Sequence, residues 1–341
     1  MTYREQQNME ITMKIRKKIK ELPPFVQGFF SSLTDQTQPL TRLGYAYDLK
    51  IFFGFLREEM GRDITIKDMR LVTFEMLQDF MAYLTYYTPV GELDIVLKNQ
   101  ARGKSRKLAA IRGLFKYLCK SKQLEANPAD LLSFPKITDK VITTLEVDEI
   151  AKLLDEVDSG EGLTGRQKIF HEHTKKRDAA IITLLLGTGM RVSECVGIDL
   201  GHIDFETGAL KITRKGGNET MLYFGDEVRA ALLAYLKIRE EINAHPGHED
   251  ALFLSMHRRR ITTRALQNMV KKYANIITKL KNISPHKLRS TFGTQLYAET
   301  RDIYLVANVL GHADVNTTRK HYAKMDEAYR RMAANKVRLR D

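Results

Sequence analysis

Three short segments in the second half of the chain carry side chains that could act on a phosphate group. Arg191 follows a glycine-rich bend at the expected start of a helix. His286 and Arg289 lie three residues apart on one face of another expected helix, and His312 precedes Tyr322 by ten residues. Guanidinium groups bind phosphate oxygens in pairs of hydrogen bonds, imidazoles donate or accept protons, and a phenol can attack phosphorus. The set is therefore suited to cleaving a phosphodiester bond.

The elements that must position these side chains are mostly helices with one small sheet. We expect helices over about 146–157 and 177–186, and a helical remainder with breaks at Pro246, Pro285 and Gly311. Alternating residues predict a β-hairpin at 209–213 and 221–224, with Lys215 in its turn. The polar stretch at about 158–176 resembles a surface insertion.

The first half of the chain predicts a helical domain. We expect a helix that Gly61 ends, a second over about 74–84 and a third, strongly basic helix within 98–122. Periodicity is then lost around two prolines, so we place a linker at about 134–144. The predicted fold is mainly α, with a helical N-terminal domain and a helix-rich α+β domain that contains a small antiparallel sheet.

The net charge narrows the class of partner. Fifty-five Lys and Arg residues against 42 Asp and Glu residues give a charge of +13. Such a surplus favours nucleic acid as the partner. A membrane is less favoured as a partner, because the sequence has no obvious basic amphipathic segment that could anchor it there. The apolar runs are too short to cross a bilayer, the charged N-terminus is unlike a secretory signal, and two cysteines are typical of a reducing compartment. These features predict a cytoplasmic protein without a membrane partner.

The basic helix within 98–122 is the strongest candidate for non-specific DNA contact. It carries nine basic residues and no acidic one, while its apolar residues recur at helical spacing. A solvated face usually mixes both signs, so a run of one sign favours phosphate contact. The predicted DNA-binding side chains are Lys104, Lys107, Arg112 and Lys116.

The ordered set in the second half resembles the tyrosine recombinases, also called phage-type integrases, and among them the Xer proteins. That family has an Arg in a bend, a Lys in a hairpin, a His-x-x-Arg pair, a Gly-His pair and a Tyr about ten residues later. This sequence matches the pattern at Arg191, Lys215, His286, Arg289, His312 and Tyr322. The first half resembles the family's helical core-binding domain. The resemblance implies a SAM-like DNA-binding domain at residues 1–135 and a catalytic domain at 145–341.

The resemblance also implies an activity: site-specific cleavage and rejoining of DNA through a 3′-phosphotyrosine, with no metal or other cofactor. Arg191 and Arg289 would bind the non-bridging phosphate oxygens. Tyr322 would attack phosphorus, and Lys215 would protonate the leaving 5′ oxygen. The two histidines would hydrogen-bond the phosphate or assist proton transfer. The implied partners are double-stranded DNA and either further copies of the chain (a dimer on one site, a tetramer at synapsis) or a paralogous recombinase.

Other interpretations remain open on the sequence alone. Each residue of the set has an ordinary structural explanation when taken singly, such as a salt bridge, a helix cap or a core position. A recombinase-like DNA-binding protein without catalysis would keep the same fold, and a type IB topoisomerase would share the phosphotyrosine chemistry. His171 and His173 could bind a metal in a different kind of nuclease, but a structural zinc site needs more ligands than this pair, so we predict a solvated loop there.

Overall fold

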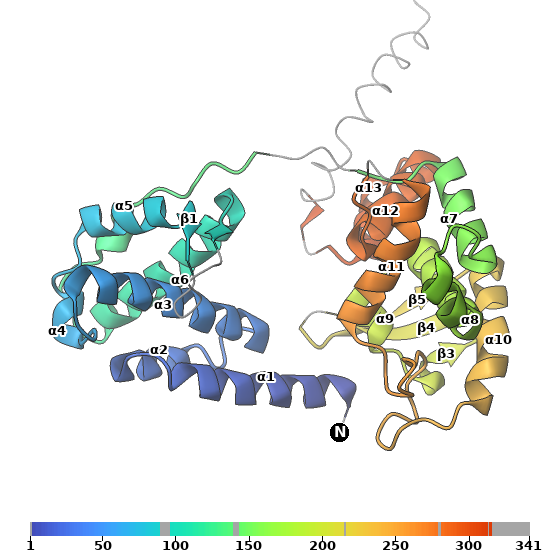
Figure 1. Cartoon of the computed structure of the whole chain (residues 1–341), viewed down its shortest axis with the longest axis horizontal. Coiled ribbons are helices and arrows are strands. Elements are labelled where there is room, and N and C mark those ends of the chain that lie inside the picture. Colours follow the sequence, from blue (N-terminus) through green and yellow to red (C-terminus); the bar gives the residue numbers. More distant parts are fainter. Residues whose placement is uncertain are drawn as a thin grey trace, which may run out of the picture. The chain divides into compact units, whose positions relative to one another are not determined.

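The computed structural model describes residues 2–88, 96–138, 143–214, 216–278, 281–312 and 314–315. The chain divides into two compact units, Met1–Lys140 and Val141–Asp341. We call them the N-terminal unit and the C-terminal unit. In the described ranges both are built of helices with small antiparallel sheets (Figure 1), so the predicted fold class is confirmed.

The N-terminal unit is helical apart from one short antiparallel strand pair in its described part. Its elements in chain order are α1 (Tyr3–Ile19), η1 (Pro24–Val26), α2 (Gln27–Ser32), α3 (Pro39–Met60), α4 (Ile66–Met69), α5 (Phe74–Tyr83), β1 (Tyr86–Tyr87), β2 (Leu97–Lys98), α6 (Ala101–Lys120) and η2 (Pro128–Leu131). Helix α3 ends at Gly61, whose φ of 65° is the left-handed conformation that glycine adopts without strain. The expected end at Gly61 and the expected helix over 74–84 are both confirmed.

An aromatic cluster joins three helices of this unit. Phe52 of α3, Phe80 of α5 and Phe115 of α6 are all fully buried. The ring centroids of Phe52 and Phe80 lie 5.2 Å apart, and those of Phe52 and Phe115 lie 6.5 Å apart. Each buried aromatic side chain removes a large apolar area from water, so this cluster fixes α6 against α3.

The C-terminal unit begins with helices and encloses a three-stranded sheet. Its elements are α7 (Val147–Ser159), α8 (Gly165–Thr188), α9 (Val192–Val196), η3 (Leu200–His202), β3 (Ile203–Asp204), β4 (Ala209–Thr213), β5 (Glu219–Tyr223), α10 (Asp226–Glu241), α11 (Thr263–Ile277), α12 (Pro285–Thr300) and α13 (Ile303–Leu310). The strand order is β3-β4-β5, all antiparallel, and Thr213 of β4 pairs with Glu219 of β5. The predicted hairpin is confirmed, and β3 adds a strand that the sequence did not predict.

Helix α8 is the central element of this unit. It packs against α7, α10 and α12, and its last three turns are buried through residues such as Ile181, Leu184 and Leu185 (Figure 1). The helix ends at Gly189, which has a φ of 61°. The buried C-terminal end of α8 therefore sets the bend that precedes Arg191.

The loop expected within the polar stretch at 158–176 is wrong, although most of its side chains are exposed, as its expected surface position implies. Helix α7 continues to Ser159, and α8 begins at Gly165, so most of the stretch is the first half of α8. His171 is 1% exposed, and its Nε2 lies 2.8 Å from the carbonyl oxygen of Val157, whereas His173 is exposed. Polar side chains on the buried face of α8 are satisfied by such bonds, which a hydropathy pattern does not reveal. Within the described ranges, no cluster of three His, Cys, Asp or Glu side chains could hold a metal ion.

No helix in the described part of the chain combines the length and the apolar character that a bilayer crossing requires.

Candidate active site

Helix α13 ends in a tight left-handed corner at Gly311. Gly311 has a φ of 62°, and its N–H donates to the carbonyl of Asn308 at 2.9 Å. The N–H of His312 donates to the carbonyl of Ala307, also at 2.9 Å. This pair of bonds is a Schellman motif, which satisfies two of the last helix carbonyls. The carbonyls of residues 309–311 are left for other donors, and His312 is fixed directly after the turn.

Three guanidinium groups bind those carbonyls. The bonds run from Arg191 to Gly311 O (3.2 Å), from Arg289 to Leu310 O, and from Arg214 to Val309 O (2.9 Å). The C-terminal end of a helix carries partial negative charge, which offsets the mutual repulsion of three nearby cations. We call these three side chains the arginine cluster. It brings two predicted phosphate ligands to the segment that carries His312.

The start of α9 holds Arg191 in place. Arg191 is the N-cap of α9, and its backbone N–H donates to Oε2 of Glu194 at 2.7 Å. Its Nη1 donates to Oε1 of the same carboxylate at 2.9 Å. The Glu194 side chain is 3% exposed and that of Arg191 is 34% exposed. A buried carboxylate thus orients the guanidinium while part of Arg191 stays open to solvent.

Gly189 allows the bend before Arg191 to approach two other helices. A Cβ atom at Gly189 would lie 2.3 Å from Phe292 and 3.0 Å from Leu310. Its φ of 61° also disfavours any other residue. The end of α8 therefore packs directly on α12 and α13, and this contact brings Arg191 to the corner at Gly311.

Helix α12 supplies the second predicted arginine from its first turns. Pro285 occupies the first helical position, where its missing N–H costs nothing. His286 follows and is exposed, whereas Arg289 is 5% exposed. Nη1 of Arg289 donates to the carbonyl of Gly189 at 2.7 Å. A buried charge requires such bonds, and here they tie α12 to both the α8 bend and the end of α13.

Two of the six predicted residues, Lys215 and Tyr322, lie outside the described residues. The sequence missed Arg214, which directly precedes Lys215. No spacing rule singles out an arginine beside a turn, and its partners are about a hundred residues further along the chain. Burial lowers the pKa of Arg214; the Glu194 carboxylate opposes this shift, and the Arg191 guanidinium adds to it. Arg214 thus interacts electrostatically with both Glu194 and Arg191, and it belongs to the same site as they do.

The predicted DNA-binding side chains of α6 have different surroundings. Lys107 is 4% exposed; its Nζ lies 3.0 Å from Oδ1 of Asn99 and 3.8 Å from Oδ1 of Asp48. Burial lowers the pKa of Lys107, and the charge of Asp48 opposes that shift. The expectation that Lys107 lies on an outer face is wrong, because the adjacent buried carboxylate draws the ammonium inward.

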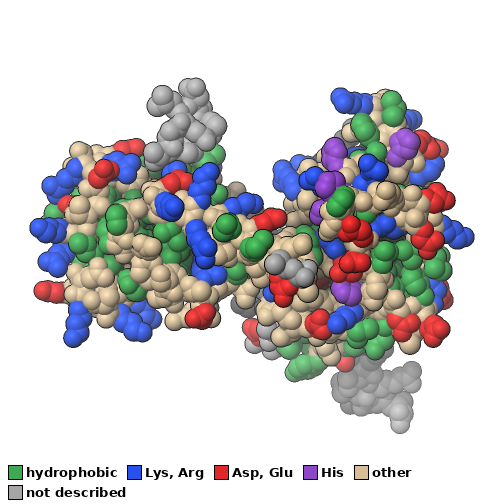
Figure 2. Space-filling view, turned by 90° about the horizontal axis from the view of Figure 1, so that it is seen from below, with side chains coloured by type: hydrophobic (Ala, Val, Ile, Leu, Met, Phe, Trp, Pro, Cys, Tyr) green, Lys and Arg blue, Asp and Glu red, His purple; other side chains and the backbone are tan. Residues whose placement is uncertain are grey.

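The other three predicted DNA-binding side chains of α6 differ in how many bonds they make inside the unit. Nζ of Lys104 donates to the carbonyl of Met81 at 2.8 Å, and Nε of Arg112 donates to that of Ala129 at 2.9 Å. Lys116 is exposed. Figure 2 shows many other Lys and Arg side chains on the visible surface of this unit. DNA contact by Lys104, Arg112 and Lys116 stays a prediction.

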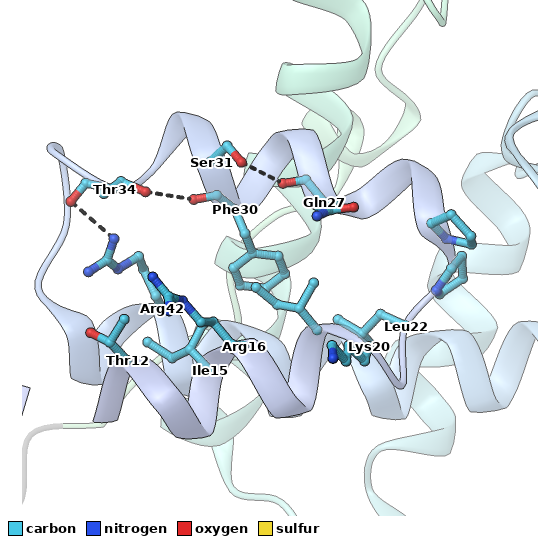
Figure 3. A pocket seen from close by; sticks show the side chains of 13 residues that line it. Thr12, Ile15, Arg16, Lys20, Leu22, Gln27, Phe30, Ser31, Thr34 and Arg42 are labelled. Atoms are coloured by element: carbon cyan, nitrogen blue, oxygen red, sulfur yellow. Dashed lines mark hydrogen bonds between the residues drawn. The ribbon is translucent and has the colours of Figure 1, made fainter. Parts of the chain in front are cut away.

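A cavity of about 760 Å³ lies in the N-terminal unit (Figure 3). All the residues that line it belong to this unit, whereas every predicted catalytic residue belongs to the C-terminal unit. Ile15 of α1 and Phe30 of α2 contribute apolar side chains, and Arg16, Lys20 and Arg42 contribute cations. The residues that line it include no carboxylate. It has neither an imidazole nor a paired acid and base, so it offers no catalytic chemistry of its own.

Comparison with known proteins agrees with the motif order. The model of the phage integrase family matches residues 143–328. Tyrosine recombinase XerC of Caldanaerobacter subterraneus subsp. tengcongensis is 33% identical over 333 residues, covering 92% of this chain and 86% of the relative. Tyrosine recombinase XerC of Leptospira interrogans is 30% identical over 291 residues, covering 84% of this chain and 85% of the relative.

Solved structures share the fold at lower identity. The XerH site-specific recombinase bound to a palindromic difH substrate has a TM-score of 0.65 at 23% identity, covering 87% of this chain and 80% of that one. The Tn1549 transposon integrase in complex with a circular intermediate DNA has a TM-score of 0.64 at 16% identity, covering 90% of this chain and 98% of that one.

Proposed function

The chain belongs to the phage integrase family of tyrosine recombinases, and from that premise we propose that Arg191 and Arg289 activate one DNA phosphate for attack by Tyr322. The protein is a tyrosine-type site-specific recombinase, an enzyme that breaks and rejoins DNA strands. The proposed catalytic residues are Arg191, Lys215, His286, Arg289, His312 and Tyr322. The proposed reaction uses neither a metal nor another cofactor.

One observation carries the proposal: Arg191 and Arg289 donate to the adjacent carbonyls of Gly311 and Leu310, next to His312. Two forks so close together can bind both non-bridging oxygens of one phosphate. In the described part of the chain Arg191 uses its Nη1 for Glu194 and its Nη2 for Gly311, so further N–H donors remain for a ligand. Cations held by such bonds would need little reorganisation during the reaction.

The strand-transfer step is balanced within the chain and the DNA. Oη of Tyr322 gives its proton to the imidazole of His286 and forms a bond to phosphorus, and the bond from phosphorus to the 5′ oxygen breaks. Lys215 gives that oxygen a proton, so a 5′ hydroxyl leaves and a 3′-phosphotyrosine remains. The phenol has an unperturbed pKa near 10, and guanidinium groups close to it in the reacting complex would favour its ionised form. Rejoining reverses each of these changes.

We also propose the parts that the two units play. The N-terminal unit would act as the core-binding domain on double-stranded DNA, and the C-terminal unit would be the catalytic domain. A lambda integrase, at 14% identity, is described as a dimer on a core site and as a tetramer on a Holliday junction. By analogy we propose a dimer on each site and a tetramer at synapsis, formed by this chain or with a paralogous recombinase. The XerC relatives above are bacterial, and we propose the bacterial cytoplasm as the place of action.

The test begins with the DNA that the protein attaches to itself in cells. Covalent complexes of the wild type and of Tyr322→Phe are isolated under denaturing conditions, and the attached DNA is sequenced to identify the site. A nicked duplex with that site then traps the intermediate, because the short cleaved strand diffuses away before it can be rejoined. We expect the wild type to form a covalent adduct, also in excess EDTA. Tyr322→Phe should form none.

Tyr329→Phe is the matched control, since this second tyrosine lies seven residues further along the chain. It should keep the adduct. An adduct that survives Tyr322→Phe would contradict the assignment of the nucleophile. Equal DNA occupancy by the wild type and Tyr322→Phe, with no adduct from either, would instead support a non-catalytic DNA-binding protein.

A further inference from the structure

Arg214 joins two segments that lie far apart in the sequence. It follows the last residue of β4 and precedes Lys215, at the start of the hairpin turn. Its Nη2 donates to the carbonyl of Val309 at 2.9 Å, and its Nη1 lies 3.4 Å from that of Asn308. The hairpin is thereby tied to the last turn of α13, directly before the corner that carries His312.

The fit of Arg214 depends on the absence of a side chain at Gly311. A Cβ atom at Gly311 would lie 1.3 Å from Nη1 of Arg214 and 2.3 Å from its Cζ. The φ of 62° at Gly311 separately favours glycine. The same residue thus ends α13 and provides the space that the guanidinium occupies.

The contact also belongs to the electrostatics of the catalytic site. Arg214 interacts with the charges of Arg191 and Glu194, and Glu194 is the carboxylate that orients Arg191. A third cation in this place costs free energy because of its burial and the repulsion of Arg191. The cation is nevertheless held there by helix-end carbonyls, whose partial negative charge compensates for it.

We propose that Arg214 is a positioning residue, which fixes the turn that carries Lys215 against the Gly311–His312 corner. This contact would hold the proton donor at a fixed position relative to the bound phosphate. The inference rests on the proposed function, in which Lys215 protonates the 5′ oxygen. Arg214 acts through Lys215, whereas Arg191 and Arg289 act on the phosphate itself. Misplacing a reacting group by about 1 Å can cost on the order of 10²-fold in rate.

The test separates the proton-transfer step from phosphate binding. In one substrate the 5′ bridging oxygen at the cleaved phosphate is replaced by sulfur. A thiol has a pKa of about 8.5, so the sulfur leaves as a thiolate without the proton that an alkoxide requires. A defect in proton donation should therefore disappear with this substrate, and a defect in phosphate binding should persist. Single-turnover cleavage rates are measured on the ordinary and the sulfur-containing duplex of the site recovered from cells.

We expect Arg214→Ala to cleave the ordinary duplex on the order of 10²-fold more slowly and the sulfur-containing duplex within about threefold of the wild type. Arg191→Ala should be slow on both. Arg229→Ala is the matched control, because Arg229 also joins the sheet region to a backbone carbonyl, that of Phe205, and should be near the wild type on both.

Two results would overturn the inference: wild-type rates for Arg214→Ala on ordinary DNA, or an equal defect on both substrates. Lys215→Ala distinguishes this failure from a failure of the proposed function, since sulfur must rescue Lys215→Ala if that lysine is the proton donor. Thermal unfolding verifies that each variant is folded. If Arg214→Ala unfolds, Arg214→Lys takes its place, because it keeps a positive donor but loses the fork; the same selective rescue is then required.

Discussion

Two groups of cations in this protein satisfy backbone carbonyls, but the carbonyls differ. On α6, Arg112 binds the carbonyl of Ala129 and Lys104 that of Met81, so these bonds join α6 to η2 and to α5 of the same unit. In the C-terminal unit, Arg191 and Arg289 bind adjacent carbonyls at the end of α13, beside a histidine. The first arrangement joins elements of the N-terminal unit, and the second concentrates positive charge beside His312, where we propose that a phosphate binds.

The comparison shows that a run of like charge is weak evidence for a ligand contact. Nine basic residues in 98–122 favoured phosphate contact, yet one of the four chosen side chains is buried against Asp48. The residues of the arginine cluster are far apart in the sequence, and none of them lies in a long run of basic residues. Residue types in a fixed order were the better guide, because they describe the requirements of a reaction instead of a surface property.

The largest expected effect contrasts Arg191 with Arg112. Arg191→Ala should slow formation of the covalent adduct about 10²–10³-fold, because each donor to a developing oxyanion contributes about 2.7–4 kcal/mol to transition-state stabilisation. Arg112→Ala should leave the rate per folded, DNA-bound molecule unchanged. Single-turnover kinetics at saturating protein provide the measurement, and equal losses in the two variants would remove the distinction between the groups.

The second effect is on stability. Lys107→Met at pH 7.5 removes one of the two cations that contact the Asp48 carboxylate and leaves the ion pair with Arg106, and it should lower the free energy of unfolding by about 1–3 kcal/mol. Lys116→Met, at an exposed site on the same helix, should change it by less than about 0.5 kcal/mol. Urea denaturation measures both. A stable Lys107→Met variant with weakened DNA binding would show that Lys107 acts on DNA after all.

A pH dependence sharpens the structural interpretation of the α6 group. Burial raises the pKa of Asp48 to about 6, against the opposing charges of Arg106 and Lys107. The folded chain then binds this proton more tightly than the unfolded chain, whose carboxyl has a pKa near 3.8. The stabilising contribution is complete below about pH 4 and is lost as the pH rises through about 6. Asp48→Asn should remove that part of the slope in urea denaturation, and an opposite slope would mean that the two cations outweigh burial.

The smallest effect concerns Lys116. If this exposed side chain contacts a phosphate, Lys116→Ala should weaken DNA binding at all sequences and reduce the slope of log affinity against log salt by about 0.9. Lys107→Met should leave the slope unchanged. Fluorescence anisotropy over a range of salt concentrations distinguishes them; an unchanged slope for Lys116→Ala would leave α6 without a demonstrated phosphate ligand.

Local rules predicted much of the fold. Gly61 and Gly189 end helices in the left-handed conformation, and the alternating residues at 209–213 form β4. The first half of α8 was missed because its buried face is polar: His171 is satisfied by the carbonyl of Val157, which only the fold brings near, and the hydroxyl of Thr174 donates to Asp178 one turn further along the helix. Hydropathy cannot distinguish such a face from a solvated loop.

The sequence predicted which types of residue form the candidate site, but it did not predict how they are arranged. The motif order indicated Arg191 and Arg289, but it could not show that both bind the end of α13. Arg214 was missed for the same reason: its partners Asn308 and Val309 are nearly a hundred residues away, and no periodicity connects them. Long-range contacts to backbone carbonyls leave no pattern of side-chain types in the sequence.

The most direct test of the account identifies the amino acid that carries the DNA. Adducts trapped on the nicked site are digested with nuclease and trypsin, and the modified peptide is sequenced by mass spectrometry. Trypsin separates the two candidates, because cleavage after Lys320 and Lys324 releases residues 321–324 with Tyr322, while Tyr329 falls in the next peptide. The account predicts a nucleotide 3′-phosphate on Tyr322, in an amount that falls with Arg191→Ala. A nucleotide on Tyr329 or on any other residue would contradict it.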